Sequence, residues 1–235
     1  MDVKINQIIQ KAYTAHKENK LEYAELLYKS ILEIQPENIN IHNNLGAILK
    51  RLGKFEEAEI SFKKSIKLKS NYPEAYVNLG NLQIYFNKLE EAEINFKKAI
   101  ELNPDFPQAY KNLALALVKL NKSEEAEACL RKAIELKADY FEAYFNLGVL
   151  YYTLGRFEDA ISSYRKSLDI NPKYEEAHNN LVKTFREQKL KKIIKDIRLD
   201  KENNTALFEK TSTKLFKPNI NLDSTRYDTR LNLNP

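Results

Sequence analysis

Glycine and proline are scarce in this chain. Among its 235 residues are five Gly and seven Pro, together about 5%, whereas the usual share in globular proteins is about 12%. These two residue types break helices and form tight turns, so their scarcity argues against a fold of many short strands. Long helices joined by short connections are the expected alternative.

The scarcity of cysteine and histidine and the lack of a long apolar run exclude further classes of protein. A single Cys excludes an internal disulfide framework, and one Cys with three scattered His does not make a zinc site. The longest strictly apolar run, LALALV (113–118), is far too short to cross a bilayer. The first residues, MDVKINQIIQKAY, do not form the apolar core of a signal peptide. We therefore expect a cytoplasmic protein without a metal, cofactor or membrane span.

The net charge of +5 is unevenly placed. Residues 1–188 contain 27 Lys and Arg against 27 Asp and Glu, whereas residues 189–235 contain 11 against 6. The larger part has no basic field that would attract nucleic acid, so no nucleic-acid partner is expected. The basic residues are densest in KLKKIIKDIRLDK (189–201). Contact of this stretch with an anionic membrane or nucleic acid is a weaker hypothesis, since such a run is usually a solvated face.

The sequence repeats with a period of 34 residues. An Asn-Leu pair followed by a small residue begins at Asn44, Asn78, Asn112 and Asn146. Two further series have the same spacing. One consists of alanines (Ala24, Ala58, Ala92, Ala126, Ala160) and the other mostly of aromatic residues (Tyr28, Phe62, Phe96, Leu130, Tyr164). Three series in register across the chain indicate one structural unit used repeatedly.

These letters at this period resemble the tetratricopeptide repeat family, whose unit is a helix–turn–helix. The resemblance implies an all-α, right-handed superhelical solenoid of about five repeats with a C-terminal capping helix. Counting position 1 of the repeat from Ile5 gives the boundaries 5–38, 39–72, 73–106, 107–140 and 141–174.

The residue types fit helical packing. Small residues at positions 8 and 20 allow two helices to approach closely, and the large residue at position 24 fills the adjacent gap. Position 15 is always Asn or Gly (Asn19, Gly53, Asn87, Asn121, Gly155). These residues best accept the left-handed conformation that ends a helix.

The pattern fails after residue 174. Position 8 of a sixth repeat is Val182, and the expected Ala and aromatic residue are Ile194 and Arg198. We therefore expect one capping helix over 175–197, because terminal repeats are normally atypical. Residues 198–235 lose the periodicity, and a largely extended or weakly ordered tail is expected there. Such a tail could also be a docking segment or the beginning of a further domain.

Asparagine recurs at position 6 of the repeat. In the family the first helix of each repeat lines the concave groove, so the resemblance implies that this row faces a ligand. The row is similar to the asparagine ladder of O-linked N-acetylglucosamine transferases. A carboxamide both donates and accepts hydrogen bonds, so the row could hold the backbone of an extended peptide or serve only local hydrogen bonds. Its members are Asn44, Asn78, Asn112, Asn146 and Asn180.

Other predicted groove residues differ from repeat to repeat, with apolar surface between cations. This composition favours a peptide with apolar and acidic side chains. The candidates are Lys50, Arg51, Asn81, Tyr85, Lys111, Lys119 and Tyr152.

Two functions remain open on the sequence. The leading prediction is a non-enzymatic scaffold or adaptor that binds a partner segment in the groove, because no catalytic constellation is present. The alternative, by analogy with arrays of this family, is the substrate-recruiting arm of a glycosyltransferase, sulfotransferase or oxygenase whose catalytic domain lies outside this chain.

Overall fold

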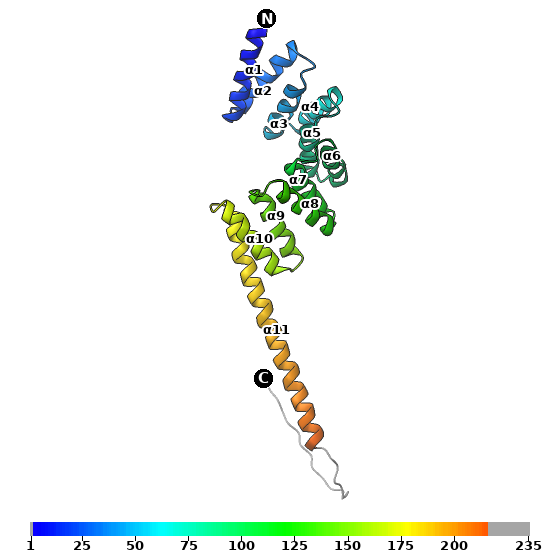
Figure 1. The fold of residues 1–235 in the computed structure, drawn as a ribbon, viewed down its shortest axis with the longest axis vertical. Coiled ribbons are helices and arrows are strands. Elements are labelled where there is room, and N and C mark those ends of the chain that lie inside the picture. Colours follow the sequence, from blue (N-terminus) through cyan, green and yellow to red (C-terminus); the bar gives the residue numbers. More distant parts are fainter. Residues whose placement is uncertain (1, 216–235) are drawn as a thin grey trace, which may run out of the picture. The chain divides into compact units, whose positions relative to one another are not determined.

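The computed structural model describes residues 2–215 of the chain, and Figure 1 shows the order of its helices. The described residues form eleven helices and no strand. The helices are α1 (Asp2–Lys17), α2 (Leu21–Ile34), α3 (Ile39–Arg51), α4 (Phe55–Leu68), α5 (Pro73–Tyr85), α6 (Leu89–Leu102), α7 (Pro107–Lys119), α8 (Ser123–Leu136), α9 (Phe141–Thr153), α10 (Phe157–Ile170) and α11 (Glu175–Leu215). The all-α prediction is confirmed.

The turns between paired helices follow the predicted signal at position 15. Asn19, Asn87 and Asn121 have φ of 62°, 57° and 59°, and Gly53 and Gly155 have φ of 75° and 70°. The next residue closes the helix end. In the second turn, for example, the Lys54 amide donates to the Leu49 carbonyl at 2.8 Å. This arrangement satisfies carbonyls that the helix end would otherwise leave unpaired.

Position 8 meets position 24 in the three pairs whose position 8 is Gly, as the sequence predicts. A Cβ added at Gly46 would lie 2.6 Å from the Phe62 ring, and one added at Gly80 would lie 2.8 Å from the Phe96 ring. In the fourth pair position 8 is Ala114 and position 24 is the smaller Leu130, both buried. In the fourth pair a larger residue at position 8 therefore accompanies a smaller one at position 24, whereas the first pair combines Ala12 with Tyr28.

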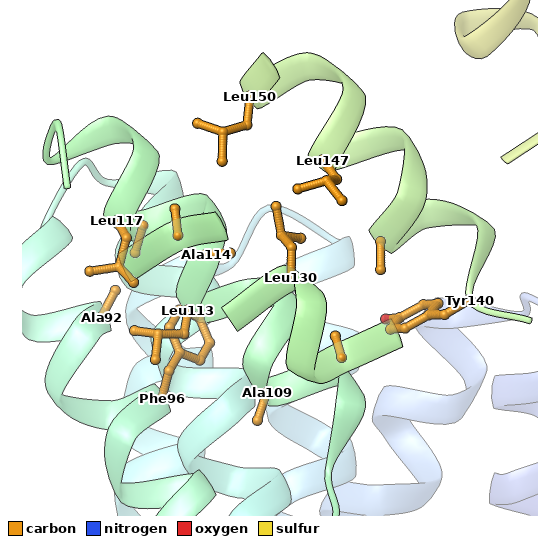
Figure 2. Packing of buried hydrophobic residues seen from close by; sticks show 14 of the residues in the cluster. Ala92, Phe96, Ala109, Leu113, Ala114, Leu117, Leu130, Tyr140, Leu147 and Leu150 are labelled. Atoms are coloured by element: carbon orange, nitrogen blue, oxygen red, sulfur yellow. The ribbon is translucent and has the colours of Figure 1, made fainter. Parts of the chain in front are cut away.

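The core runs along the pairs as two clusters of buried residues, one from Ala12 to Leu82 and the other from Val77 to Tyr164. Figure 2 shows Leu113, Leu130 and Leu147, from three successive helices, in the second cluster. Each helix pair therefore buries its apolar face against the next pair, as in a repeat stack.

Helix α11 is longer than predicted. The capping helix was expected over 175–197 and a largely extended tail after it, but the helix continues to Leu215. Residues 198–215 contain neither Gly nor Pro, and Pro218 is the first breaker that follows, so nothing in the sequence stops the helix earlier. The predicted tail beyond residue 215 lies outside the described residues.

The structure divides into two compact units, Met1–Phe185 and Arg186–Pro235, with the boundary inside α11. The first unit contains all the helix pairs and the beginning of α11. Of the helices described, none combines the length and the apolar character that crossing a bilayer requires.

Candidate functional site

The first helices of the pairs lie on the inner side of the stack. Successive first helices approach one another, α3 with α5, α5 with α7 and α7 with α9. The second helices, such as α4 and α6, do not approach one another to the same extent. We call the surface of α3, α5, α7, α9 and the beginning of α11 the inner face. The predicted site residues all lie on these helices.

Part of the asparagine row links neighbouring helices. Asn78 Nδ2 donates to Asn43 Oδ1 at 2.9 Å, and Asn112 Nδ2 donates to Asn81 Oδ1 at 2.8 Å. Asn112 is only 5% exposed, so its amide stabilises the contact between α5 and α7. For Asn112 the geometry therefore favours the local hydrogen bond over contact with a peptide. Asn44 and Asn146 are half-buried.

Two predicted cations of the inner face are half-buried. Burial lowers the pKa of the Lys50 ammonium on α3 below its ordinary value. Burial also lowers the pKa of Lys111 on α7, against the Glu142 carboxylate, which raises it. The Lys111 Nζ lies 5.7 Å from the centroid of the Tyr140 ring. Within the described part of the chain, neither ammonium has a carboxylate at ion-pair distance. These cations have therefore lost water without gaining a full counter-charge.

Two other predicted cations differ from this pair. The guanidinium of Arg51 donates to the side chain of Asn19 in the neighbouring turn. Lys119 is exposed on α7. The four predicted cations thus fall into two classes, two half-buried and two exposed at the surface.

An exposed aromatic cluster includes the predicted Tyr85. The ring centroids of Phe55 and Tyr85 are 4.5 Å apart, and Phe86 lies edge-on to both rings at 5.4 and 5.3 Å. Tyr85 is 62% exposed. Because each ring is supported by the other two, Tyr85 presents a fixed apolar surface to solvent.

A pocket of about 270 Å³ lies where α9, α10 and the beginning of α11 meet. The Lys183 Nζ stands 5.0 Å from the centroid of the Tyr152 ring. Asn180 and Tyr164 both line this pocket. The structure therefore brings the predicted Tyr152 and Asn180 to one place. The complete lining is Val149, Tyr152, Thr153, Tyr164, Asn180 and Lys183.

The opposite, outer side carries a series of ion pairs that the sequence reasoning missed. Glu93 on α6 accepts from Lys97 of the same helix at 2.6 Å and from Lys122, at the start of the next second helix, at 2.8 Å. Glu25 binds Lys29 and Lys54 in the same way, both at 2.8 Å. Each of these glutamates therefore joins two successive second helices.

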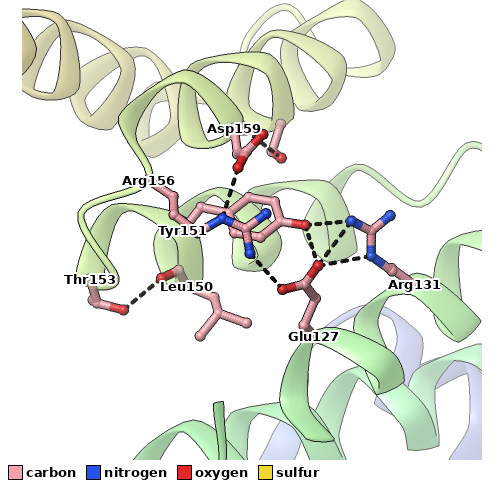
Figure 3. A network of polar contacts seen from close by, with 8 residues as sticks. Glu127, Arg131, Leu150, Tyr151, Thr153, Arg156 and Asp159 are labelled. Carbon is pink, nitrogen blue, oxygen red and sulfur yellow. Dashed lines mark hydrogen bonds and ion pairs between the residues drawn. The ribbon is translucent and has the colours of Figure 1, made fainter. Parts of the chain in front are cut away.

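The third such carboxylate, Glu127, has the most partners. It accepts from Arg131 and Arg156 at 2.9 Å each and from the Tyr151 hydroxyl at 2.8 Å (Figure 3). Arg156 also pairs with Asp159 at 2.8 Å, and its guanidinium carbon lies 4.2 Å from the centroid of the Tyr151 ring. This network holds α8, α9 and α10 together.

The 34-residue spacing could have revealed this series. Position 21 is Glu in four repeats (Glu25, Glu59, Glu93, Glu127), and position 16 of the following repeat is always Lys or Arg (Lys54, Lys88, Lys122, Arg156). The fifth repeat has Ile161 at position 21, and the register then has Leu190 at position 16. Acid and base disappear together where the repeat pattern ends.

Each of the three histidines lies within hydrogen-bonding distance of one nearby group. His42 Nε2 and His178 Nε2 lie 2.8 Å from the carbonyl oxygens of Pro36 and Pro172, and His16 Nδ1 lies 3.2 Å from the Tyr28 hydroxyl. The residues described contain no group of three His, Cys, Asp or Glu that could hold a metal ion. The contacts that the structure shows for these three rings are therefore local ones.

Models of the tetratricopeptide repeat match the chain at residues 37–105, 95–128 and 112–175. Residues 37–175 are tetratricopeptide repeats. No match was found among the curated proteins, so the likeness of the asparagine row to that of O-linked N-acetylglucosamine transferases stays a prediction.

Solved structures of tetratricopeptide repeat proteins share the fold. A thermophilic member from Thermus thermophilus is 21% identical with a TM-score of 0.67, over 77% of this chain and 98% of the other. MamA is 25% identical with a TM-score of 0.60, over 70% and 96%. YrrB, described as having an unusual peptide-binding site, is 22% identical with a TM-score of 0.58, over 73% and 89%. The repeat array thus matches almost the whole of these proteins.

Proposed function

We propose that this protein is an interaction scaffold whose inner face binds an extended acidic segment of a partner protein. The observation that carries the proposal is the pair of half-buried ammonium groups, Lys50 and Lys111, which have no carboxylate at ion-pair distance within the described residues. A carboxylate supplied by a ligand would restore the charge balance that burial disturbs. A hydrogen bond to a charged group contributes about 1.5–3 kcal/mol, so two such contacts would provide useful affinity.

The apolar part of the proposed ligand would contact aromatic surface. Tyr85 lies on α5, between the helices that carry Lys50 and Lys111, and its ring is held in place by Phe55 and Phe86. Farther along, Tyr152 and Val149 give the pocket an apolar wall, and Lys183 stands at the Tyr152 ring. Alternation of cationic and aromatic surface suits a segment in which acidic and apolar side chains alternate.

The comparisons support a binding function in general terms. YrrB has a peptide-binding site by its description, and its fold is that of this array. At this level of identity the likeness is one of fold, and the ligand is inferred from the residues of the inner face. The non-enzymatic role is proposed on the same grounds.

A peptide library would test the proposal directly. Random 12-residue peptides displayed on phage are selected on the full-length protein and then measured against the variant Lys50→Gln/Lys111→Gln. We expect selected peptides to be enriched in Asp and Glu and to lose at least about tenfold in affinity for the variant. The matched control is Lys64→Gln/Lys166→Gln, which removes two exposed charges from second helices and should leave affinity unchanged.

Two results would contradict the proposal. One is a set of selected peptides no richer in Asp and Glu than the starting library. The other is equal loss of affinity in the inner-face variant and in the control, since only a nonspecific attraction to net charge behaves in that way. Circular dichroism of both variants checks that the helices are intact.

A further inference from the structure

The part of α11 beyond the first unit carries an unpartnered apolar stripe. At about 100° per residue, Leu190, Ile193, Ile194 and Ile197 fall within one arc of about 100° of the helix. Their side chains are 41–62% exposed. Isolated exposed apolar residues are normal on a protein surface. Four large aliphatic residues at the spacing i, i+3, i+4 and i+7 form instead a continuous amphipathic face.

The stripe is short, and polar residues border it at both ends. The same helical spacing places Arg186 before it and Lys201 and Asn204 after it. The stripe therefore covers residues 190–197, about 12 Å of helix. A coiled coil needs an apolar pattern sustained over at least three or four heptads, and a stable protein interface buries about 800 Å² on each side. This surface is too small for either.

Cations occupy the rest of the helix circumference. Lys189, Lys192, Lys195 and Arg198 are all exposed and point to different sides outside the apolar arc. Residues 189–201 carry six Lys and Arg against two Asp, a net charge of +4. A second copy of this chain would meet the same charge, so self-association is disfavoured. An extended anionic surface touches the cations next to the apolar arc and attracts the others through its field, which extends over about a Debye length.

We propose that residues 189–199 form an interfacial helix that binds the surface of anionic lipid bilayers. The stripe enters the boundary between headgroups and acyl chains, and the surrounding cations attract the headgroups. Because the apolar stripe is short, binding depends on both contributions, and it is reversible. The repeat array would then be held at a membrane surface without spanning it.

Vesicle flotation with the full-length chain tests this proposal. The probes are vesicles of phosphatidylcholine alone and vesicles with 30% phosphatidylserine, each in about 0.1 M and 0.5 M salt. We expect the protein to bind the anionic vesicles at least about tenfold better than the neutral ones. The preference should fall at high salt, because the Debye length shortens from about 10 Å to a few ångströms.

A pair of variants separates the stripe from general surface hydrophobicity. Ile193→Ser/Ile197→Ser removes two residues of the stripe and should reduce binding at least tenfold. Leu199→Ser removes an apolar side chain that is also exposed but lies on the opposite side of the helix, and it should leave binding within about twofold. Circular dichroism confirms that helix content is unchanged in both.

Several results would overturn the proposal. Absence of binding to either vesicle would favour an acidic protein groove. Equal binding to neutral and anionic vesicles would exclude an electrostatic contribution to membrane binding. An equal loss of binding in Leu199→Ser and in Ile193→Ser/Ile197→Ser would exclude a specific contribution of the apolar stripe. Tighter binding to single-stranded RNA than to vesicles, unaffected by Ile193→Ser/Ile197→Ser, would favour a nucleic-acid ligand, because contacts with phosphate groups do not need the apolar stripe.

Discussion

The outer and inner faces of the helix stack differ in whether their charged side chains are paired. On the outer face Glu25, Glu93 and Glu127 each bind at least two cations. On the inner face Lys50 and Lys111 are half-buried and lack a carboxylate at ion-pair distance within the described part of the chain. The outer charges are satisfied by the protein itself, whereas the proposed function assigns the inner cations to a ligand.

Paired charges on the outer face and unpaired cations on the inner face also affect the stability of the folded protein differently. Ion pairs between successive second helices stabilise the stack and fix the register of neighbouring repeats. A cation that is desolvated without a counter-charge costs stability in the free protein. Proteins commonly keep such costs where function needs them. The contrast therefore predicts that mutations on the two faces change stability in opposite directions.

The strongest effect is expected where the inner and outer helices are joined. Gly80→Ala would place a methyl group 2.8 Å from the Phe96 ring, so the ring must shift. Overpacking of this kind typically costs about 1–3 kcal/mol. We expect a loss of about 2–3 kcal/mol in the free energy of unfolding, measured by urea denaturation, together with weaker peptide binding because both faces depend on this contact.

A second substitution distinguishes a clash from other causes. The fourth repeat has the pair Ala114 and Leu130 in the places of Gly80 and Phe96. Adding Phe96→Leu to Gly80→Ala copies that pair, and it should recover at least half of the lost stability. A double variant less stable than Gly80→Ala alone would refute the explanation by volume.

A smaller loss is expected from the outer face. Glu93→Ala leaves Lys97 and Lys122 without their shared carboxylate. The Glu93 side chain is only 10% exposed, but the two lysines are 56% and 42% exposed, so water replaces much of what they lose. We expect a decrease of about 1–2 kcal/mol in the free energy of unfolding. The control Glu101→Ala breaks an exposed pair with Lys98 and should cost less than about 0.5 kcal/mol.

The pH dependence of this loss gives an independent check. Hydrogen bonds from Lys122 and Lys97 lower the pKa of Glu93, against burial, which raises it. A lowered carboxyl pKa stabilises the folded state above the unfolded-state pKa, 4.5 here, and the contribution disappears as the pH falls through the folded-state value. The stability gap between wild type and Glu93→Ala should therefore narrow from about pH 5 to pH 3. A constant gap would mean that the side chain stabilises by packing alone.

Much of the fold could be predicted because its determinants are local and repeated. Gly53 and Asn87 end helices through the conformations that these residues accept most easily, and Gly46 leaves room for the Phe62 ring. Each signal occurs once per repeat, so a single misjudged residue does not change the result. The end of α11 could not be predicted in this way, because the repeat pattern had stopped and only the lack of a breaker before Pro218 was informative.

The site was less predictable because exposure depends on contacts between repeats. Asn112 and Asn146 occupy the same repeat position, yet Asn112 is buried and donates to Asn81 of the preceding repeat, whereas Asn146 is half-buried. The partners in the ion pairs between second helices lie 29 residues apart in the sequence, as Glu93 and Lys122 do. That spacing has meaning only after the second helices are known to be neighbours.

The smallest effect should come from the inner face, with the opposite sign. Lys50→Met keeps most of the side-chain volume and removes the half-buried charge, so we expect the free energy of unfolding to increase by about 0.5–1 kcal/mol at pH 7. Burial lowers the pKa of Lys50 below its ordinary 10.5, so the folded protein releases this proton before the unfolded chain does. The wild type should therefore regain stability as the pH rises toward 10.5, and the advantage of Lys50→Met should shrink there. Lys119→Met, at an exposed cation of the same face, is the control and should show no such pH-dependent gain. If Lys50→Met were less stable than wild type at pH 7, the Lys50 ammonium would already be satisfied in the free protein, and the contrast between the two faces would fail at this residue.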